Sequence, residues 1–128
     1  WDFGFQHYAN ITPHGTLMVS SHMPGSKTNH GFIEFDIDKN NETLIEKWYF
    51  DGGDEWAHAM GEAHYVLGES DNILGNYGTA GVIKEITQDK QVAWQVKFDG
   101  DWPNDAYNKM VGHCILFDDL YALVQGPE

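Results

Sequence analysis

The chain contains no arginine, and this absence restricts what it can bind. All seven of its basic residues are lysines, against 20 Asp and Glu, so the formal net charge of the 128 residues is -13 at pH 7. A surface of this sign repels phosphate backbones and anionic lipids, so we expect no nucleic-acid partner and no anionic membrane partner. The sequence also lacks an apolar run of the roughly eighteen residues that a spanning helix needs, which predicts no membrane span.

Cysteine is nearly absent as well. Cys114 is the only one, so it cannot form an internal disulfide, and its apolar neighbours predict an inert core thiol. Two triplets, Asn10-Ile11-Thr12 and Asn41-Glu42-Thr43, match the N-glycosylation acceptor pattern. Asn10 and Asn41 are therefore candidate glycosylation sites, and they favour a compartment outside the cytoplasm.

Short runs of aromatic and β-branched residues, each bounded by Gly, Asn, Asp or Pro, dominate what is present. They predict many short antiparallel strands and an all-β fold. Residues 5–23 also alternate like a strand, with a turn at 13–15, which places His7 in or just before a hairpin. The best helical candidate, 105–111, is short. The predicted strands are 32–37, 44–50, 65–67, 82–87, 92–98, 115–117 and 120–124.

The sequence contains an internal repeat. Residues 31–53 and 81–101 each run from an apolar strand through a polar turn into a strand with a tryptophan, Trp48 or Trp94, and end in Phe-Asp-Gly. Hairpin repeats about fifty residues apart are typical of β-propeller blades. We predict one partial propeller domain over 1–128, with blade-like repeats at about 5–53 and 61–101 and closing strands at 113–125. We expect both tryptophans at equivalent, buried positions.

Two segments resemble a known family. The stretch "ILGNYGTAGVIKEITQDKQVAWQV" (73–96), and the pair Gln6-His7 followed by a Pro13-x-Gly15 turn and "FIEFDID" (32–38), are similar to blades of the arylsulfotransferase-like β-propellers. The resemblance covers the C-terminal blades of that family. It implies two to three four-stranded blades of a larger ring, because so few blades cannot close by themselves. The remaining blades are expected from other residues or other chains.

The resemblance also implies an activity that uses no nucleotide cofactor. A histidine at the position of His7 attacks the sulfur of a phenolic sulfate and passes the sulfuryl group to a phenol, outside the cytoplasm, in the periplasm or the extracellular medium. Gln6, His22, His58 and His64 are the candidate substrate-binding residues. Without arginine, bidentate binding of the sulfate has to come from residues outside this chain. The alternatives are a non-catalytic extracellular propeller that binds a ligand or a protein, and a His7 that packs against the backbone.

The remaining histidines and acidic loops predict no specific metal site. His14, His22 and His30 lie eight residues apart, and His58 and His64 lie six apart, without the tight spacing of a zinc motif. The segment 36–47 resembles a calcium loop but lacks its glycine and closing acid, so we interpret it as a solvated turn. The acidic loops 51–56 and 99–105 are candidate calcium-binding loops. Four aromatic residues beside loops could stack on a ligand ring or cap the blades: Trp56, Tyr77, Trp102 and Tyr107.

Overall fold

A computed structural model describes residues 4–22, 30–52, 55, 57–66, 68, 70–99 and 110–116. Within these residues the fold is all-β, as the sequence predicted, and the helical structure is limited to one 3-10 turn at Gly78–Ala80. No helix in the described part of the chain is long and apolar enough to cross a membrane.

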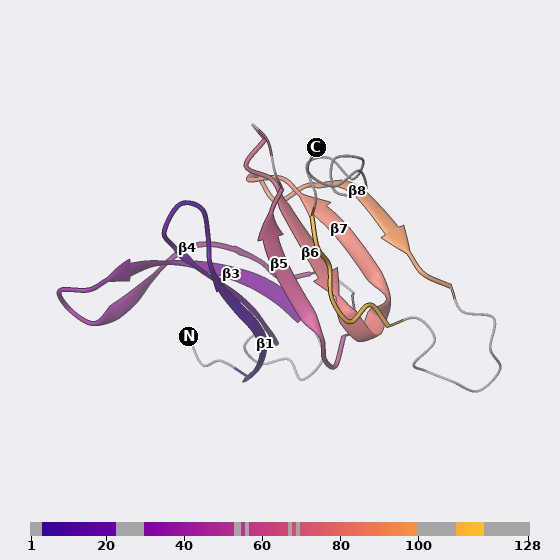
Figure 1. Cartoon of the computed structure of the whole chain (residues 1–128), viewed down its shortest axis with the longest axis horizontal. Coiled ribbons are helices and arrows are strands. Elements are labelled where there is room, and N and C mark those ends of the chain that lie inside the picture. The colour runs from indigo at the N-terminus through magenta and orange to yellow at the C-terminus, as the bar shows by residue number, and fades with distance from the viewer. Residues whose placement is uncertain are drawn as a thin grey trace, which may run out of the picture.

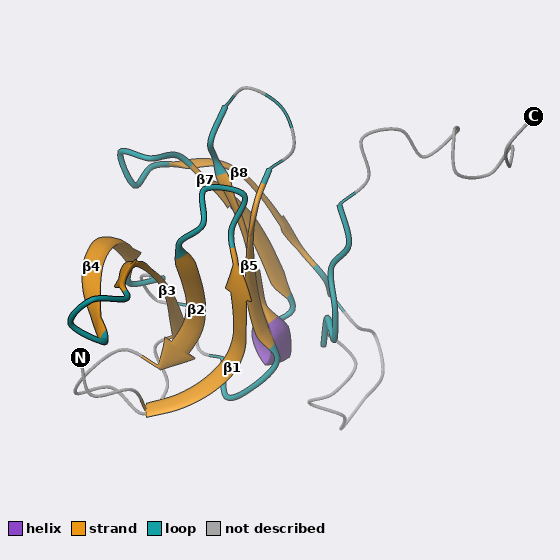
Figure 2. Cartoon of the chain, turned by 60° about the vertical axis from the view of Figure 1, so that its left-hand side comes forward, coloured by secondary structure: helices purple, strands orange, loops and turns teal. Residues whose placement is uncertain are grey.

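The strands form two four-stranded antiparallel sheets in which each strand pairs with the next along the chain. Figure 1 shows them side by side, and Figure 2 shows β1 and β2 next to β5. Sheet 1 contains β1 (Gly4–Ile11), β2 (Leu17–His22), β3 (His30–Asp38) and β4 (Thr43–Phe50). Sheet 2 contains β5 (Gly61–Tyr65), β6 (Ile73–Tyr77), β7 (Val82–Ile86) and β8 (Val92–Lys97).

The two sheets correspond to the two predicted repeats. Trp48 pairs with Glu34 and Trp94 pairs with Glu85, and each pair lies directly beside a β-bulge. The tryptophans are therefore equivalent in register, as predicted. The described residues do not close a ring.

Some predicted elements were misplaced. The apolar run 65–67 suggested a strand, but β5 ends at Tyr65, and the N–H of Val66 donates to Asn72 to close the turn instead. Ile115 and Leu116 of the predicted closing strands have no strand pairing. Residues 117–125 and most of the helical candidate 105–111 lie outside the described residues, and Met110 and Val111 are not helical.

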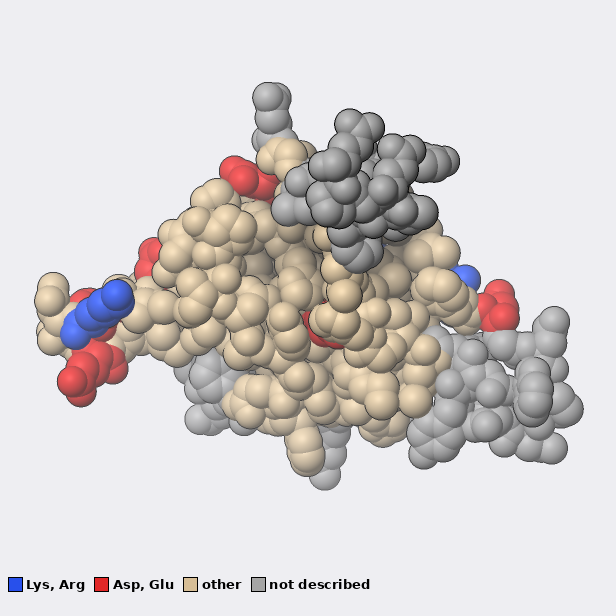
Figure 3. Space-filling model, viewed as in Figure 1, with Lys and Arg blue, Asp and Glu red and all other residues tan. Residues whose placement is uncertain are grey.

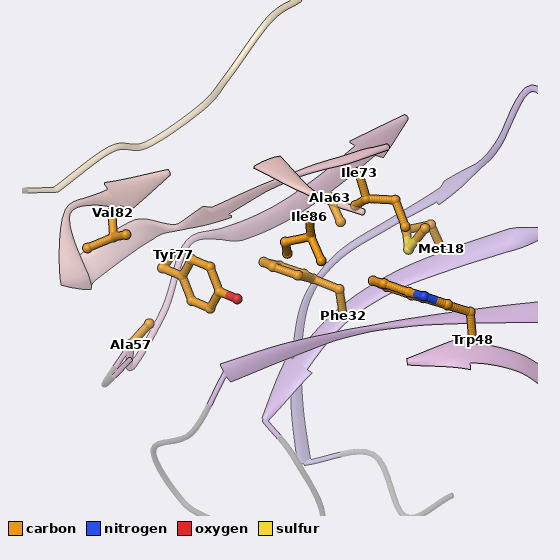
Figure 4. Close-up of a cluster of buried hydrophobic side chains, with 9 residues drawn as sticks. All are labelled: Met18, Phe32, Trp48, Ala57, Ala63, Ile73, Tyr77, Val82 and Ile86. Carbon is orange, nitrogen blue, oxygen red and sulfur yellow. The ribbon is translucent and has the colours of Figure 1, made fainter. Parts of the chain in front are cut away.

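The core lies between the sheets, where Met18, Phe32 and Trp48 of sheet 1 point toward residues of sheet 2 (Figure 4). The indole N–H of Trp48 also donates to the carbonyl of Gln88 across the interface, at 3.0 Å. A Cβ at position 75 would lie 2.1 Å from the Phe32 ring, so the close approach of the sheets requires a glycine there. The sheet 2 members of the core are Ala63, Ile73, Tyr77, Val82 and Ile86.

Two predictions about aromatic residues are wrong. Trp94 is 45% exposed, because its side of β8 faces away from sheet 1 and nothing in the described structure covers it as sheet 2 covers Trp48. Tyr77 is a fully buried residue of β6 rather than a loop residue. Trp56, Trp102 and Tyr107 lie outside the described residues.

Candidate functional site

His22 is the last residue of β2 and His30 is the first residue of β3, and the two lie directly opposite each other. Directly paired residues point to the same side of a sheet, so the two imidazoles are neighbours. Both are buried, with His30 completely inaccessible and His22 5% exposed. The strand pairing therefore brings together two residues that the sequence separates by eight positions.

His7 reaches the same place through an irregularity in β1. Gln6 pairs with Ser21 and Tyr8 pairs with Ser20, so His7 is an extra residue in a bulge, and the preceding step, at Phe5, is irregular too. Phe5 has a φ of 55°, which is unusual for a residue with a Cβ. Bulges re-aim side chains and are frequent beside functional sites. The local backbone thus turns the half-buried His7 toward β2 and β3.

The three imidazoles form one compact group, which we call the histidine cluster (His7, His22 and His30). The ring centroid of His7 lies 5.5 Å from that of His22 and 5.4 Å from that of His30. The centroids of His22 and His30 are 5.8 Å apart. One ring nitrogen from each residue lies within 4.8 Å of the other two.

The surrounding residues hold the rings in place. The Nε2 of His22 lies 3.2 Å from the carbonyl oxygen of His58, and the Nε2 of His30 bonds to the hydroxyl of Ser20. The segment that carries His58 is fixed in turn, because its N–H donates to the Thr79 hydroxyl at 2.7 Å. Gly61 of sheet 2 covers the Ser20–His30 pair so closely that a Cβ there would lie 1.8 Å from Nε2.

Three ring nitrogens in the cluster are buried and have no hydrogen-bond partner among the described residues: His7 Nε2, His22 Nδ1 and His30 Nδ1. Burial lowers the pKa of His7, and burial together with the neighbouring imidazoles lowers the pKa of His30 to about 3. Both rings are therefore neutral at pH 7, with a lone pair available on one nitrogen each.

The sequence placed two members of the cluster among its candidates, His7 and His22, and considered His30 only as a turn or loop histidine. Gln6 is exposed next to His7 on β1. His58 contributes its carbonyl oxygen to the cluster. The signal for His30 was its symmetry with His22 about one hairpin connection, which becomes informative only once the hairpin register is known.

His64 belongs to a second group on sheet 2. Its Nε2 lies 3.2 Å from buried Glu62, which also accepts a hydrogen bond from His113 Nδ1 at 2.8 Å and one from the Cys114 N–H at 3.2 Å. The ring of His64 lies 5.1 Å from that of Tyr8. His64, Tyr8, His113 and Cys114 border a cavity of about 400 Å³ between β1, β5 and the segment 110–116. His64 therefore makes its contacts with Glu62 and Tyr8 and is not a member of the histidine cluster.

The glycosylation and calcium candidates differ in their surroundings. The side-chain amide of Asn10 donates to the carbonyl of Ala63 at 2.8 Å, between the sheets. Asn41 lies in the exposed β3–β4 turn, where Asp38 accepts from its backbone and its side chain. These hydrogen bonds, the side-chain one first, lower the pKa of Asp38. They stabilise the exposed turn that the sequence predicted for this segment. Calcium binding by the acidic loops 51–56 and 99–105 stays a prediction.

Charged side chains lie mostly at the edges of the face seen in Figure 3, including the tip of the long β3–β4 hairpin.

No family model and no curated protein matches this sequence. The likeness to arylsulfotransferase-like propellers therefore rests on the motifs quoted above.

Proposed function

We propose that the chain forms two blades of an arylsulfotransferase-like β-propeller that transfers sulfuryl groups from phenolic sulfates to phenols, outside the cytoplasm and without a nucleotide cofactor. The observation that carries this proposal is the state of His7. It lies in a bulge, its Nε2 has no hydrogen-bond partner in the described structure, and burial lowers its pKa so that the ring is neutral. In the tautomer that has its hydrogen on Nδ1, Nε2 of this neutral imidazole carries the lone pair, and such a nitrogen is the nucleophile that this chemistry requires.

The reaction proceeds in two displacements. In the first, the lone pair on His7 Nε2 attacks sulfur, the bond from sulfur to the aryl oxygen breaks, and its electron pair leaves with the phenolate. In the second, the oxygen of an acceptor phenol attacks the same sulfur, the N–S bond breaks, and the electron pair returns to Nε2. The proton of the acceptor phenol ends on the departed phenolate, so the imidazole is regenerated unchanged.

His22 has a geometry that suits it to assist the second displacement. A carbonyl oxygen only accepts hydrogen bonds, so the contact with His58 places the ring hydrogen of neutral His22 on Nε2. Nδ1 then carries a lone pair beside His7 and is able to receive the acceptor's proton. Arginine is absent from the chain, so any bidentate guanidinium donors to the sulfate oxygens belong to the rest of the propeller. Gln6 is retained as a substrate-binding candidate.

The test uses 4-nitrophenyl sulfate as donor and phenol as acceptor. His7→Asn should lower acceptor-dependent release of 4-nitrophenolate by about a thousand-fold or more, because the covalent route is lost. The matched control is His14→Asn, which changes an exposed histidine of the β1–β2 turn and should retain the rate. Mass spectrometry of donor-treated protein should find sulfation on the peptide containing His7. Full activity in His7→Asn would overturn the proposal.

A second candidate is a non-catalytic propeller that binds a protein or a ligand in an extracellular assembly. The observation that favours it is the apolar stripe of β8, by which we mean three residues of β8 and the phenylalanine that follows it, with side chains 40 to 45% exposed: Val92, Trp94, Val96 and Phe98. Such a row on an outer strand is typical of a surface that another protein segment covers. Absence of sulfuryl transfer, together with binding that depends on Trp94, would favour this function over the first.

A further inference from the structure

The histidine cluster has a feature that sulfuryl transfer does not require. One nucleophile needs one lone pair, yet three buried ring nitrogens of the cluster lack a hydrogen-bond partner in the described part of the chain. Buried polar atoms are nearly always paired, because leaving them unpaired forfeits their interaction with water. The three rings that carry these atoms form one compact group, in which one nitrogen of each ring lies within 4.8 Å of the other two, so they call for a common partner.

The bonds made by the other nitrogens determine where lone pairs lie. In neutral His22 the hydrogen is on Nε2, which faces the His58 carbonyl, so Nδ1 carries the lone pair. His30 has the same arrangement when its Nε2–H donates to the Ser20 hydroxyl. An imidazole that donates one N–H to a protein oxygen and presents its other nitrogen inward is the usual form of a metal-ligating histidine.

We propose that His7, His22 and His30 bind one transition-metal ion of the zinc class through three imidazole nitrogens, with a fourth coordination position left for water or a ligand. Histidine nitrogens suit Zn²⁺, Cu²⁺ or Ni²⁺, whereas Ca²⁺ and Mg²⁺ prefer oxygen. The formal net charge of -13 attracts cations rather than anions. Three histidines with an open position also form a recurrent zinc arrangement.

The distances are compatible with this after a small adjustment. One ring nitrogen of each histidine lies within 4.8 Å of the other two, whereas bonds of 2.0–2.1 Å to a tetrahedral zinc place ligand nitrogens about 3.4 Å apart. His22 and His30 are fixed by strand pairing and by their hydrogen bonds. His7 is half-buried in an irregular part of β1 and is the ligand with most freedom to approach.

Metal binding goes beyond the proposed function and does not depend on it. A bound ion takes the lone pair of His7 Nε2, so the metal-bound chain cannot use His7 as a nucleophile. Metal would then inhibit transfer. If the chain lacks sulfotransferase activity, the metal site still stands, and if it binds no metal, the transfer proposal still stands.

Binding is measured on the full chain after treatment with a chelator and removal of the chelator. Titration with ZnCl₂ against a chromophoric zinc indicator should give one equivalent bound, and Co²⁺ should give the visible absorption of a tetrahedral complex. His22→Asn should abolish the Co²⁺ spectrum. Ser20→Ala, which removes the partner of His30, should weaken zinc binding by about 10- to 100-fold. His14→Asn, in the exposed β1–β2 turn, is the matched control and should bind as the parent chain does.

Folding of each variant is checked by far-ultraviolet circular dichroism. If His22→Asn does not fold, His7→Asn provides the same test with less buried surface at risk. No saturable binding of either ion to the folded parent chain would overturn the proposal. Binding that survives the loss of His7 or His22 but not of His64 or His113 would also overturn it, because the ion would then belong to the Glu62 group.

Discussion

Gly61 determines how closely sheet 2 covers the histidine cluster. A Cβ at this position would lie 1.8 Å from His30 Nε2 and 2.3 Å from the Ser20 hydroxyl oxygen. We expect Gly61→Ala to lower the free energy of unfolding by about 1–3 kcal/mol, because the added methyl group overpacks a buried site. Urea unfolding measures this. Gly112→Ala is the control, since nothing lies within 4 Å of its Cβ position, and equal stability of the two variants would contradict the packing described here.

Cys114 gives a prediction about reactivity. Burial, and then the nearby charge of Glu62, raise the pKa of its thiol. A raised pKa means less thiolate at any given pH, so the rate of alkylation by iodoacetamide should rise with pH around a midpoint above that of a free thiol. Glu62→Gln should move this midpoint down. Glu42→Gln, in the exposed β3–β4 turn, should leave it unchanged. A midpoint at the free-thiol value in the parent chain would contradict the prediction.

Among the single residues of the site, His7 could be predicted from the sequence and His30 could not. The pair Gln6-His7 and the turn that follows it indicated His7, because a local motif carried the signal. His30 looked like a loop histidine, since eight residues separate it from His22 and spacing along the chain does not reveal strand register. The bulge in β1 was invisible for the same reason. It is defined by pairing with Ser20 and Ser21, which the sequence does not display.

At the scale of strands, Trp48 and Trp94 provide a matched comparison. They occupy equivalent positions beside a bulge, but Trp48 is 7% exposed and Trp94 is 45% exposed. Trp48→Ala should cost about 3–5 kcal/mol, because it removes a packed indole and its bond to Gln88. Trp94→Ala should cost about 1 kcal/mol or less. Equal losses in urea unfolding would show that Trp94 is covered after all.

The strands β3, β4, β7 and β8 could be predicted because their side chains alternate and because the repeat marks them twice. The β1–β2 hairpin could be predicted as far as its turn. β5 was misplaced, since its residues include Gly61 and Glu62, whose burial depends on contacts with other elements. The β6 strand contains Gly75 and Asn76, which have low strand propensity and are buried through tertiary contacts.

In the molecule as a whole, sheet 2 packs against sheet 1, and the segment 110–116 packs against sheet 2. The ring of His64 on β5 contacts Tyr8 on β1, and His113 contacts Glu62 on β5. The segment also bonds to sheet 2 through Val111, whose carbonyl accepts from Asn76 and whose N–H donates to Gly78. Figure 1 shows this segment in yellow, passing over β5 and β6. The side of sheet 2 that faces away from sheet 1 is therefore covered near β5 by the segment 110–116.

The other half of that side is the apolar stripe of β8. In sheet 1 the side that carries Trp48 is buried by a second sheet, so in the repeat the side that carries Trp94 should be covered in the same way. We expect the 128-residue polypeptide to use this stripe for self-association, because it leaves large apolar side chains exposed on an edge strand. Sedimentation velocity should show association that increases with concentration. The double variant Trp94→Lys, Val96→Lys should be monomeric, whereas Ile11→Lys, which changes an exposed apolar residue of β1, should associate as the parent chain does. A parent chain that stays monomeric at every concentration, or a double variant that associates equally, would show that this side of β8 is not an interface.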